Sequence, residues 1–124
     1  MSKNLSNKTI LVVEDDREIG EVIIEVLLEE TQYSAYLATN AHDGLRMMKE
    51  TKPDLLLLDY QLPSMTGLQL FDQIRTMEGL QDIPTIMISA NLPWSELEKR
   101  GIVGLEKPFD LDNFVGLVRK MLDR

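Results

Sequence analysis

The sequence predicts an α/β fold in which a parallel sheet is covered by helices on both faces. Short apolar runs alternate with helical patterns five times along the 124 residues, which is typical of strands joined by crossover helices. The clearest run, 55–58, consists of four leucines without polar alternation, as expected for a strand buried on both faces. Periodicity alone leaves a short buried helix open here, but Pro53 and Pro63 bound the run and favour a strand.

Before this leucine run, the pattern predicts two strands and two helices. The stretch 9–13 is apolar and β-branched and is expected to form a buried strand, and 33–38 a shorter one. Between these strands, apolar residues recur at helical spacing and are expected to face the core: Ile19, Val22, Ile23, Val26 and Leu27. Thr39 or Asn40 can cap the next helix, at 41–49. The inner positions of that helix are expected to be Ala41, Leu45 and Met48.

After the leucine run, a loop leads to Thr66, which is expected to cap a third helix. The inward residues of this helix are predicted to be Leu70, Phe71 and Ile74. A linker bracketed by Gly79 and Pro84 follows, and 85–88 is the fourth apolar strand.

The last part of the chain is less regular. A short helix is expected at 95–100, because Ser95 and Glu98 form a capping-box pattern and Gly101 would end the helix. A weak strand, interrupted by glycine, is expected at 102–105. The final helix is predicted from about Asp110 to Leu122, and its core-facing residues are Leu111, Phe114, Val115, Val118 and Met121 or Leu122.

Composition excludes several classes of protein. The net charge of −8 argues against a direct grip on nucleic acid, which requires a basic patch. The absence of cysteine excludes disulfides and thiolate metal sites. No apolar run reaches the ~18 residues of a membrane span, so no membrane contact is expected. Residues 1–8 form a polar tail unlike a signal peptide, and 9–124 a single domain, so we expect a cytoplasmic location.

Polar side chains follow the predicted strands, and right-handed crossovers bring these strand ends to one edge of the sheet. They are Glu14, Asp15, Asp16, Asp59, Ser89 and Lys107. Grouped carboxylates repel each other unless a cation lies among them, and oxygen ligands favour Mg²⁺ or Ca²⁺. An aspartate can also act as a nucleophile toward a phosphoryl group, while a lysine neutralises the transferring charge. Taken singly, an acidic turn at the start of a helix is usually a cap, and a lysine such as Lys107 is usually solvated. The joint placement of these residues at one edge favours phosphoryl chemistry.

The chain resembles the receiver domain of two-component response regulators from Ile10 to its C-terminus. The motifs that carry the resemblance are Ile-Leu-Val-Val-Glu-Asp-Asp at 10–16, Asp59 with Pro63, Met65 and Gly67, Ser89-Ala90, and Lys107-Pro108-Phe109. The resemblance implies a flavodoxin-like (βα)5 domain with strand order 2-1-3-4-5. It also implies a signalling protein that takes a phosphoryl group from a histidine kinase or histidine phosphotransfer protein, rather than an enzyme that turns over an external substrate.

The same resemblance assigns roles to the residues at the sheet edge. Asp59 matches the phosphoacceptor of the family. Lys107 matches the lysine of the family's active site, and Ser89 matches the switch hydroxyl. Asp15 is implied to bind Mg²⁺ directly, Glu14 through water, and Gln61 through its backbone carbonyl. Asp59 is also implied to be a ligand of the metal. Asp16 is expected to cap the first helix instead. The peptide bond before Pro108 is expected to be cis, which is accessible only before proline, and Gln61 and Asn91 match positions that modulate the phosphate lifetime.

Two departures from the family concern how the phosphorylated state would be read. Gly104 replaces the tyrosine or phenylalanine that usually lies three residues before the lysine. The segment from Ser89 to Lys107 is shorter than usual by roughly one helical turn of ~4 residues, so the fourth helix is expected to be short or distorted. Trp94 is expected either in the core or as an exposed anchor for a partner.

Other functions remain open from the sequence. The main alternative is an interaction module whose altered face, 91–105, binds a protein partner independently of phosphorylation. A phosphohydrolase with an aspartyl nucleophile is disfavoured, because it would normally have a second carboxylate two residues after Asp59, where this chain has Gln61. A dinucleotide or flavin site is disfavoured because the first turn is acidic and has no glycine-rich cradle. No output domain follows Arg124 in this sequence, so we expect either that the protein acts by docking or that this chain is one domain of a larger protein. The sequence does not identify the downstream target.

Overall fold

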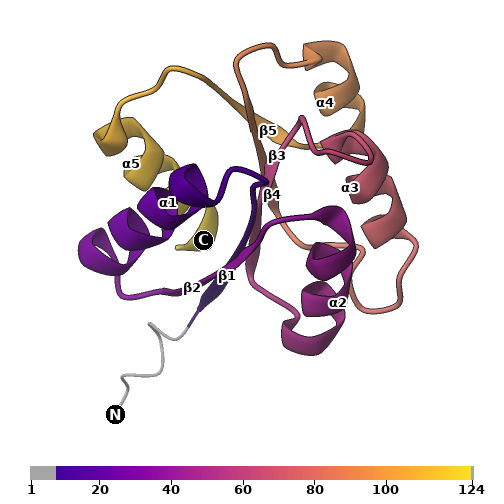
Figure 1. Cartoon of the computed structure of the whole chain (residues 1–124), viewed down its shortest axis with the longest axis horizontal. Coiled ribbons are helices and arrows are strands. Elements are labelled where there is room, and N and C mark those ends of the chain that lie inside the picture. Colours follow the sequence, from indigo (N-terminus) through magenta and orange to yellow (C-terminus); the bar gives the residue numbers. More distant parts are fainter. Residues whose placement is uncertain (1–7, 124) are drawn as a thin grey trace.

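The computed structural model describes residues 8–123 and shows five strands and five helices in alternation (Figure 1). Their bounds are β1 (Thr9–Val13), α1 (Arg17–Glu30), β2 (Ser34–Ala38), α2 (Ala41–Thr51), β3 (Leu55–Asp59), α3 (Gly67–Arg75), β4 (Thr85–Ser89), α4 (Trp94–Arg100), β5 (Val103–Glu106) and α5 (Leu111–Leu122). All four strand pairs are parallel and the order is β2-β1-β3-β4-β5, which confirms the predicted fold. The predicted tail, except for Lys8, lies outside the described residues.

The leucine run forms the centre of the sheet. Leu55, Leu56, Leu57 and Leu58 are each at most 1% exposed, and β3 is paired with β1 on one side and β4 on the other. Alternate leucines face opposite layers. Leu56 and Leu58 pack with the core under α2, α3 and α4, whereas Leu55 and Leu57 pack with the core under α1 and α5. Figure 1 shows these two groups of helices on opposite sides of the sheet. The strand interpretation is therefore confirmed.

Side-chain caps begin most of the helices, as the sequence indicates. Asn40, rather than Thr39, caps α2 by accepting a hydrogen bond from the Asp43 amide. Thr66 caps α3 with a reciprocal bond from Gln69, and the three residues predicted to face inward on α3 are buried. These caps satisfy amide groups that a helix start otherwise leaves without partners.

The prediction for α1 and α5 is wrong at three positions. Ile19, Val22 and Leu111 are 41%, 54% and 54% exposed, although all three were expected in the core. Their apolar side chains lie along an open groove of about 300 Å³ between α1 and α5, instead of against the sheet. Helical spacing reveals an apolar stripe, but it does not show how much of that stripe the sheet covers.

The fourth helix is the shortest of the five in the described part of the chain, with seven residues. Its predicted capping box is wrong, because α4 begins one residue early, at Trp94, and Ser95 therefore lies inside the first turn. Pro93 occupies the N-cap, and within residues 8–123 no side chain caps the helix. The end is as predicted: Gly101 adopts the left-handed conformation at φ +71°, which favours glycine.

The described helices offer no membrane span, since none combines the length and the apolar character that crossing would require. His42 is exposed on α2.

Candidate functional site

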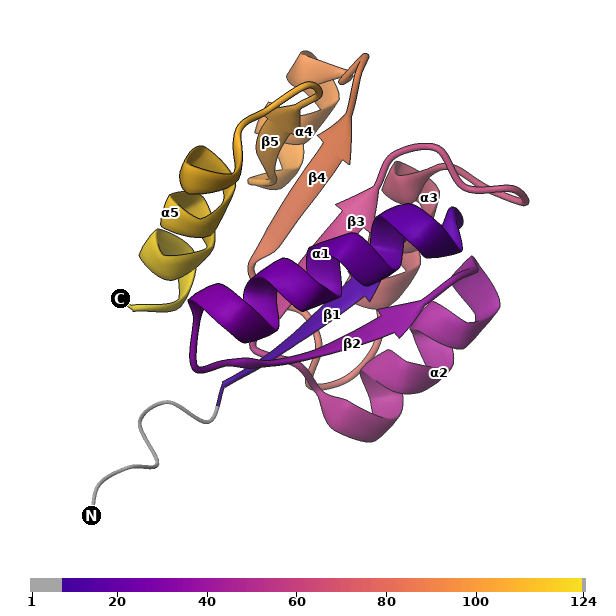
Figure 2. The same cartoon turned by 60° about the vertical axis from the view of Figure 1, so that its left-hand side comes forward.

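The carboxyl ends of four strands bring polar groups to one edge of the sheet. Glu14 follows β1, Asp59 and Ser89 are the last residues of β3 and β4, and Lys107 follows β5. Figure 2 shows the arrowheads of β1, β3 and β4 pointing toward the same edge. The Glu14 amide still donates to the Ala38 carbonyl at 3.0 Å, so the backbone that carries Glu14 is held by the sheet. Each group is therefore positioned by sheet backbone rather than by a free loop.

Three carboxylates meet at this edge. Glu14, Asp15 and Asp59 each offer one oxygen atom, and these atoms lie within 4.8 Å of one another. Glu14 is 4% exposed and Asp59 8%, whereas Asp15 is exposed. Oxygen donors at this spacing suit a hard divalent cation such as Mg²⁺, which commonly binds one or two carboxylates and keeps several waters. The residues thus fit a magnesium site.

Burial alters the titration of the two inner carboxyl groups. It raises the pKa of Glu14 to about 7, and the nearby charge of Asp59 acts in the same direction against the Asp16 amide and Lys107. Burial also raises the pKa of Asp59, opposed by the Gln61 amide, which donates to Oδ1 at 3.1 Å. Two charged carboxylates buried side by side are energetically costly without a cation, so the pair tends to keep a proton. Binding of a cation should therefore release protons.

Lys107 and Ser89 complete the polar edge. The Lys107 ammonium lies 4.0 Å from Oε1 of Glu14, and its side chain is 34% exposed. The Lys107 amide donates to the Ser89 carbonyl at 2.9 Å, and the Lys107–Pro108 peptide bond is cis, as predicted. Ser89 is 4% exposed, and its hydroxyl accepts a hydrogen bond from the Asn91 amide at 3.2 Å.

Asp16 lies apart from the three carboxylates and caps α1, as the sequence indicates. Its Oδ1 accepts hydrogen bonds from the amides of Glu18 at 3.0 Å and Ile19 at 3.2 Å. The carbonyl of Gln61 stays a predicted ligand. The Gln61 amide donates to Oδ1 of Asp59 at 3.1 Å.

Gly67 has a steric role that the pattern analysis did not find. A Cβ at this position would lie 2.6 Å from the backbone oxygen of Asp59 and 3.0 Å from Cα of Tyr60. Such contacts cannot be relieved by turning a side chain. The start of α3 therefore packs directly against the end of β3 because residue 67 is glycine. A glycine immediately after a helix cap was the available sequence signal.

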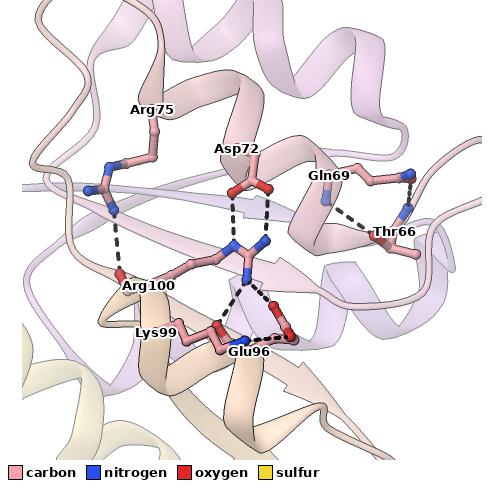
Figure 3. Close-up of polar contacts among 7 residues, drawn as sticks. All are labelled: Thr66, Gln69, Asp72, Arg75, Glu96, Lys99 and Arg100. Carbon is pink, nitrogen blue, oxygen red and sulfur yellow. Dashed lines mark hydrogen bonds and ion pairs between the residues drawn. The ribbon is translucent and has the colours of Figure 1, made fainter.

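The region of α4 and β5 also holds contacts that the sequence did not reveal. Trp94, for which core and surface placements were both open, is 52% exposed and contacts the position of Gly104. Arg100 donates from Nε and Nη2 to the two carboxylate oxygens of Asp72, at 2.8 and 2.9 Å, and from Nη1 to Glu96 at 2.8 Å (Figure 3). Its guanidinium lowers the pKa of Asp72. Glu96 and Arg100 have helical spacing, but Asp72 is 28 residues away.

Comparison with known proteins places this geometry in one family. The family model for the response regulator receiver domain matches residues 10–119. The phosphate regulon transcriptional regulatory protein PhoB of Pseudomonas aeruginosa is 35% identical over 94% of this chain and 52% of its own length. The polar-differentiation response regulator DivK of Brucella anthropi is 28% identical over 93% of this chain and 96% of its own length. The chain thus spans about half the length of PhoB and nearly all of DivK.

A solved structure has the same fold. The CheY-like response regulator receiver domain protein from Methanospirillum hungatei superposes with a TM-score of 0.85 at 24% identity, covering 95% of both chains.

Proposed function

The chain belongs to the response regulator receiver domain family of two-component signalling, and on this basis we propose that Asp59 accepts a phosphoryl group from a phosphohistidine donor in a magnesium-dependent reaction. The observation that carries the proposal is the meeting of Glu14, Asp15 and Asp59, whose oxygen atoms lie within 4.8 Å of one another at the end of β3. Two buried carboxyl groups with raised pKa values beside a lysine are typical of a functional site.

The proposed transfer uses groups already present at this edge. A carboxylate oxygen of Asp59 attacks phosphorus, the bond between phosphorus and the donor imidazole nitrogen breaks, and the imidazole leaves with that electron pair. Asp15 would bind Mg²⁺ directly, Glu14 through water, and Gln61 through its carbonyl. Bound there, Mg²⁺ neutralises charge on the phosphoryl oxygens. Lys107 would supply the second positive charge and Ser89 a hydroxyl donor to a phosphoryl oxygen.

The partners follow from this chemistry. A histidine kinase or a histidine phosphotransfer protein is the proposed phosphoryl donor. An unidentified downstream protein is proposed to bind the phosphorylated state. We propose that 9–124 acts as one receiver domain that catalyses its own phosphorylation and dephosphorylation without turning over an external substrate. The predicted cytoplasmic location stays a prediction.

Phosphorylation by a small donor tests the proposal without knowledge of the kinase. Wild-type protein incubated with acetyl phosphate and MgCl₂ should gain the mass of one phosphoryl group, and EDTA should prevent the gain. Asp59→Asn keeps the shape of the side chain and should gain nothing. Asp54→Asn is the matched control, because Asp54 lies at the opposite end of β3 and bonds Thr9, and it should be phosphorylated like the wild type. An unmodified wild type would refute the proposal.

The alternative function, binding of a protein through 91–105 without phosphorylation, is favoured by the half-exposed indole of Trp94. Exposed tryptophans often anchor protein interfaces. This function predicts that a bound partner has the same affinity for the wild type, for its phosphorylated form and for Asp59→Asn.

A further inference from the structure

Gly104 leaves a space on β5 that three side chains from the α4 region fill. A Cβ at this position would lie 2.6 Å from Cζ3 of Trp94, 2.9 Å from Cδ1 of Leu97 and 3.0 Å from Cδ1 of Leu92. Each of these distances is shorter than an ordinary carbon–carbon contact, so no larger residue fits at 104 unless these side chains move. The indole of Trp94 therefore rests on the backbone of β5, while 52% of the residue is exposed to solvent.

The two ends of α4 are held in different ways. At the C-terminal end, Arg100 binds both carboxylate oxygens of Asp72 on α3, and Arg75 donates to the Arg100 carbonyl at 3.4 Å (Figure 3). Paired guanidinium–carboxylate bonds fix orientation as well as distance. At the N-terminal end, Pro93 is the N-cap and no side chain in the described part of the chain caps the helix. That end is held by the packing of apolar side chains over Gly104.

A short path connects the N-terminal end of α4 to the candidate site. The Ser89 hydroxyl accepts a hydrogen bond from the Asn91 amide at 3.2 Å, and Leu92, the next residue, is 7% exposed. The Trp94 amide donates to the Leu92 carbonyl at 3.0 Å. A hydroxyl that turns to donate to a phosphoryl group on Asp59 changes the direction of the lone pairs that accept from Asn91. The turn leading into α4 would then lose a restraint.

We propose that α4 pivots about its Arg100 end when Asp59 is phosphorylated, which lifts Trp94 off Gly104 and exposes the indole as the surface readout of the phosphorylated state. This inference rests on the proposed function. It also accounts for the absence of an aromatic residue at position 104. The aromatic ring that packs on β5 belongs to Trp94 of α4, and Gly104 leaves the space for it. In this proposal, the start of α4 is the element that has two arrangements. The state of Asp59 and the contacts of the indole both shift the equilibrium between them.

The single tryptophan of the chain makes the proposal measurable, because all tryptophan emission comes from position 94. Wild-type protein is treated with acetyl phosphate and MgCl₂, and each sample is divided between intact-mass measurement and acrylamide quenching of tryptophan fluorescence. Trp94 is 52% exposed before phosphorylation, so full release would raise its exposed surface, and with it the quenching constant, up to about twofold. The increase should follow the fraction of phosphorylated chains.

The two readouts separate the inference from the function on which it rests. Phosphoryl gain without increased quenching, or with reduced quenching, would overturn the inference and leave the proposed function intact. Absence of phosphoryl gain would overturn both.

Two variants locate the effect. In the double variant Trp94→Phe and Tyr36→Trp, the only tryptophan lies on β2 at the far edge of the sheet, at a position that is 45% exposed. Its quenching should be the same before and after phosphorylation. An equal rise there would indicate a change of the whole domain and would overturn the pivot. Gly104→Ala should raise quenching of Trp94 before phosphorylation and shrink the further increase. Unaltered quenching in a folded Gly104→Ala protein would also contradict the inference.

Discussion

The edge around Asp59 and the region of α4 and β5 are built by different means. At the Asp59 edge, each functional group is the last residue of a strand or lies just after one, so the sheet backbone positions it. In the α4–β5 region, position depends on contacts between side chains of separate elements, such as Arg100 with Asp72 and Trp94 over Gly104. Groups positioned by sheet backbone suit chemistry, whereas side-chain contacts between separate elements can be exchanged, as the proposed readout requires. Substitutions in the two regions should therefore have separable effects.

Lys107→Ala should give the largest effect, and one confined to chemistry. Loss of a cation that stabilises charge in the transition state should slow phosphorylation of Asp59 by acetyl phosphate roughly 10²–10³-fold. The initial rate of mass gain measures this effect. Lys120→Ala removes an exposed lysine of α5 and should leave the rate unchanged. Acrylamide quenching of Trp94 in the unphosphorylated protein should be the same in both variants; a large change in Lys107→Ala would break the separation between the two regions.

The pH dependence of stability should also originate at the Asp59 edge. Because the pKa of Glu14 is raised from 4.5 to about 7, the folded protein binds a proton that the unfolded chain releases in this window. The resulting stabilisation is complete below about pH 4.5 and is lost as the pH rises through about 7. Without metal, the free energy of unfolding in urea should fall by about 1–3 kcal/mol between about pH 5 and pH 8.

Glu14→Gln cannot lose this proton and should flatten the dependence. Addition of Mg²⁺ at the higher pH should restore stability to the wild type, because the ion binds the folded carboxylates. Equal slopes in wild type and Glu14→Gln would place the titration elsewhere and contradict the assignment to this edge.

Asp72→Asn should have the smallest effect, and it should leave the chemistry alone. The two side chains of the pair are 24% and 53% exposed, so loss of the Arg100 contact should lower the free energy of unfolding by about 0.5–1 kcal/mol. Asp82→Asn, at an exposed position in the linker before β4, is the control and should have a negligible effect on urea unfolding. Phosphorylation by acetyl phosphate should keep its wild-type rate in Asp72→Asn. A rate loss comparable to that of Lys107→Ala would show that the regions are not separable.

The same difference explains what the sequence could predict. The strands, their order and the gathering of Glu14, Asp15 and Asp59 follow from apolar runs, family motifs and the rule that parallel strand ends share one edge. Asp16 as a cap and the cis bond before Pro108 were also predicted correctly. These features depend on neighbours in the sequence or on backbone topology.

The remaining features depend on side-chain contacts between distant elements. Ile19 and Val22 have the spacing of core residues, but their side chains are exposed along the groove between α1 and α5 instead of being covered by the sheet. The bond between Arg100 and Asp72 joins two helices whose relative position no local pattern specifies. For Trp94, the sequence left core and surface open, and the structure shows that the ring does both: one side rests on Gly104 and the other meets solvent.

The most direct test of the account is to identify the residue that carries the phosphoryl group. Protein phosphorylated by acetyl phosphate and MgCl₂ is reduced with borohydride, which cleaves an acyl phosphate and converts the modified aspartate to homoserine, and its peptides are sequenced by mass spectrometry. We expect the modification at Asp59 alone, with Asp15 at the same edge and Asp54 at the opposite end of β3 both unmodified. Modification at another carboxylate, with Asp59 intact, would contradict the central claim.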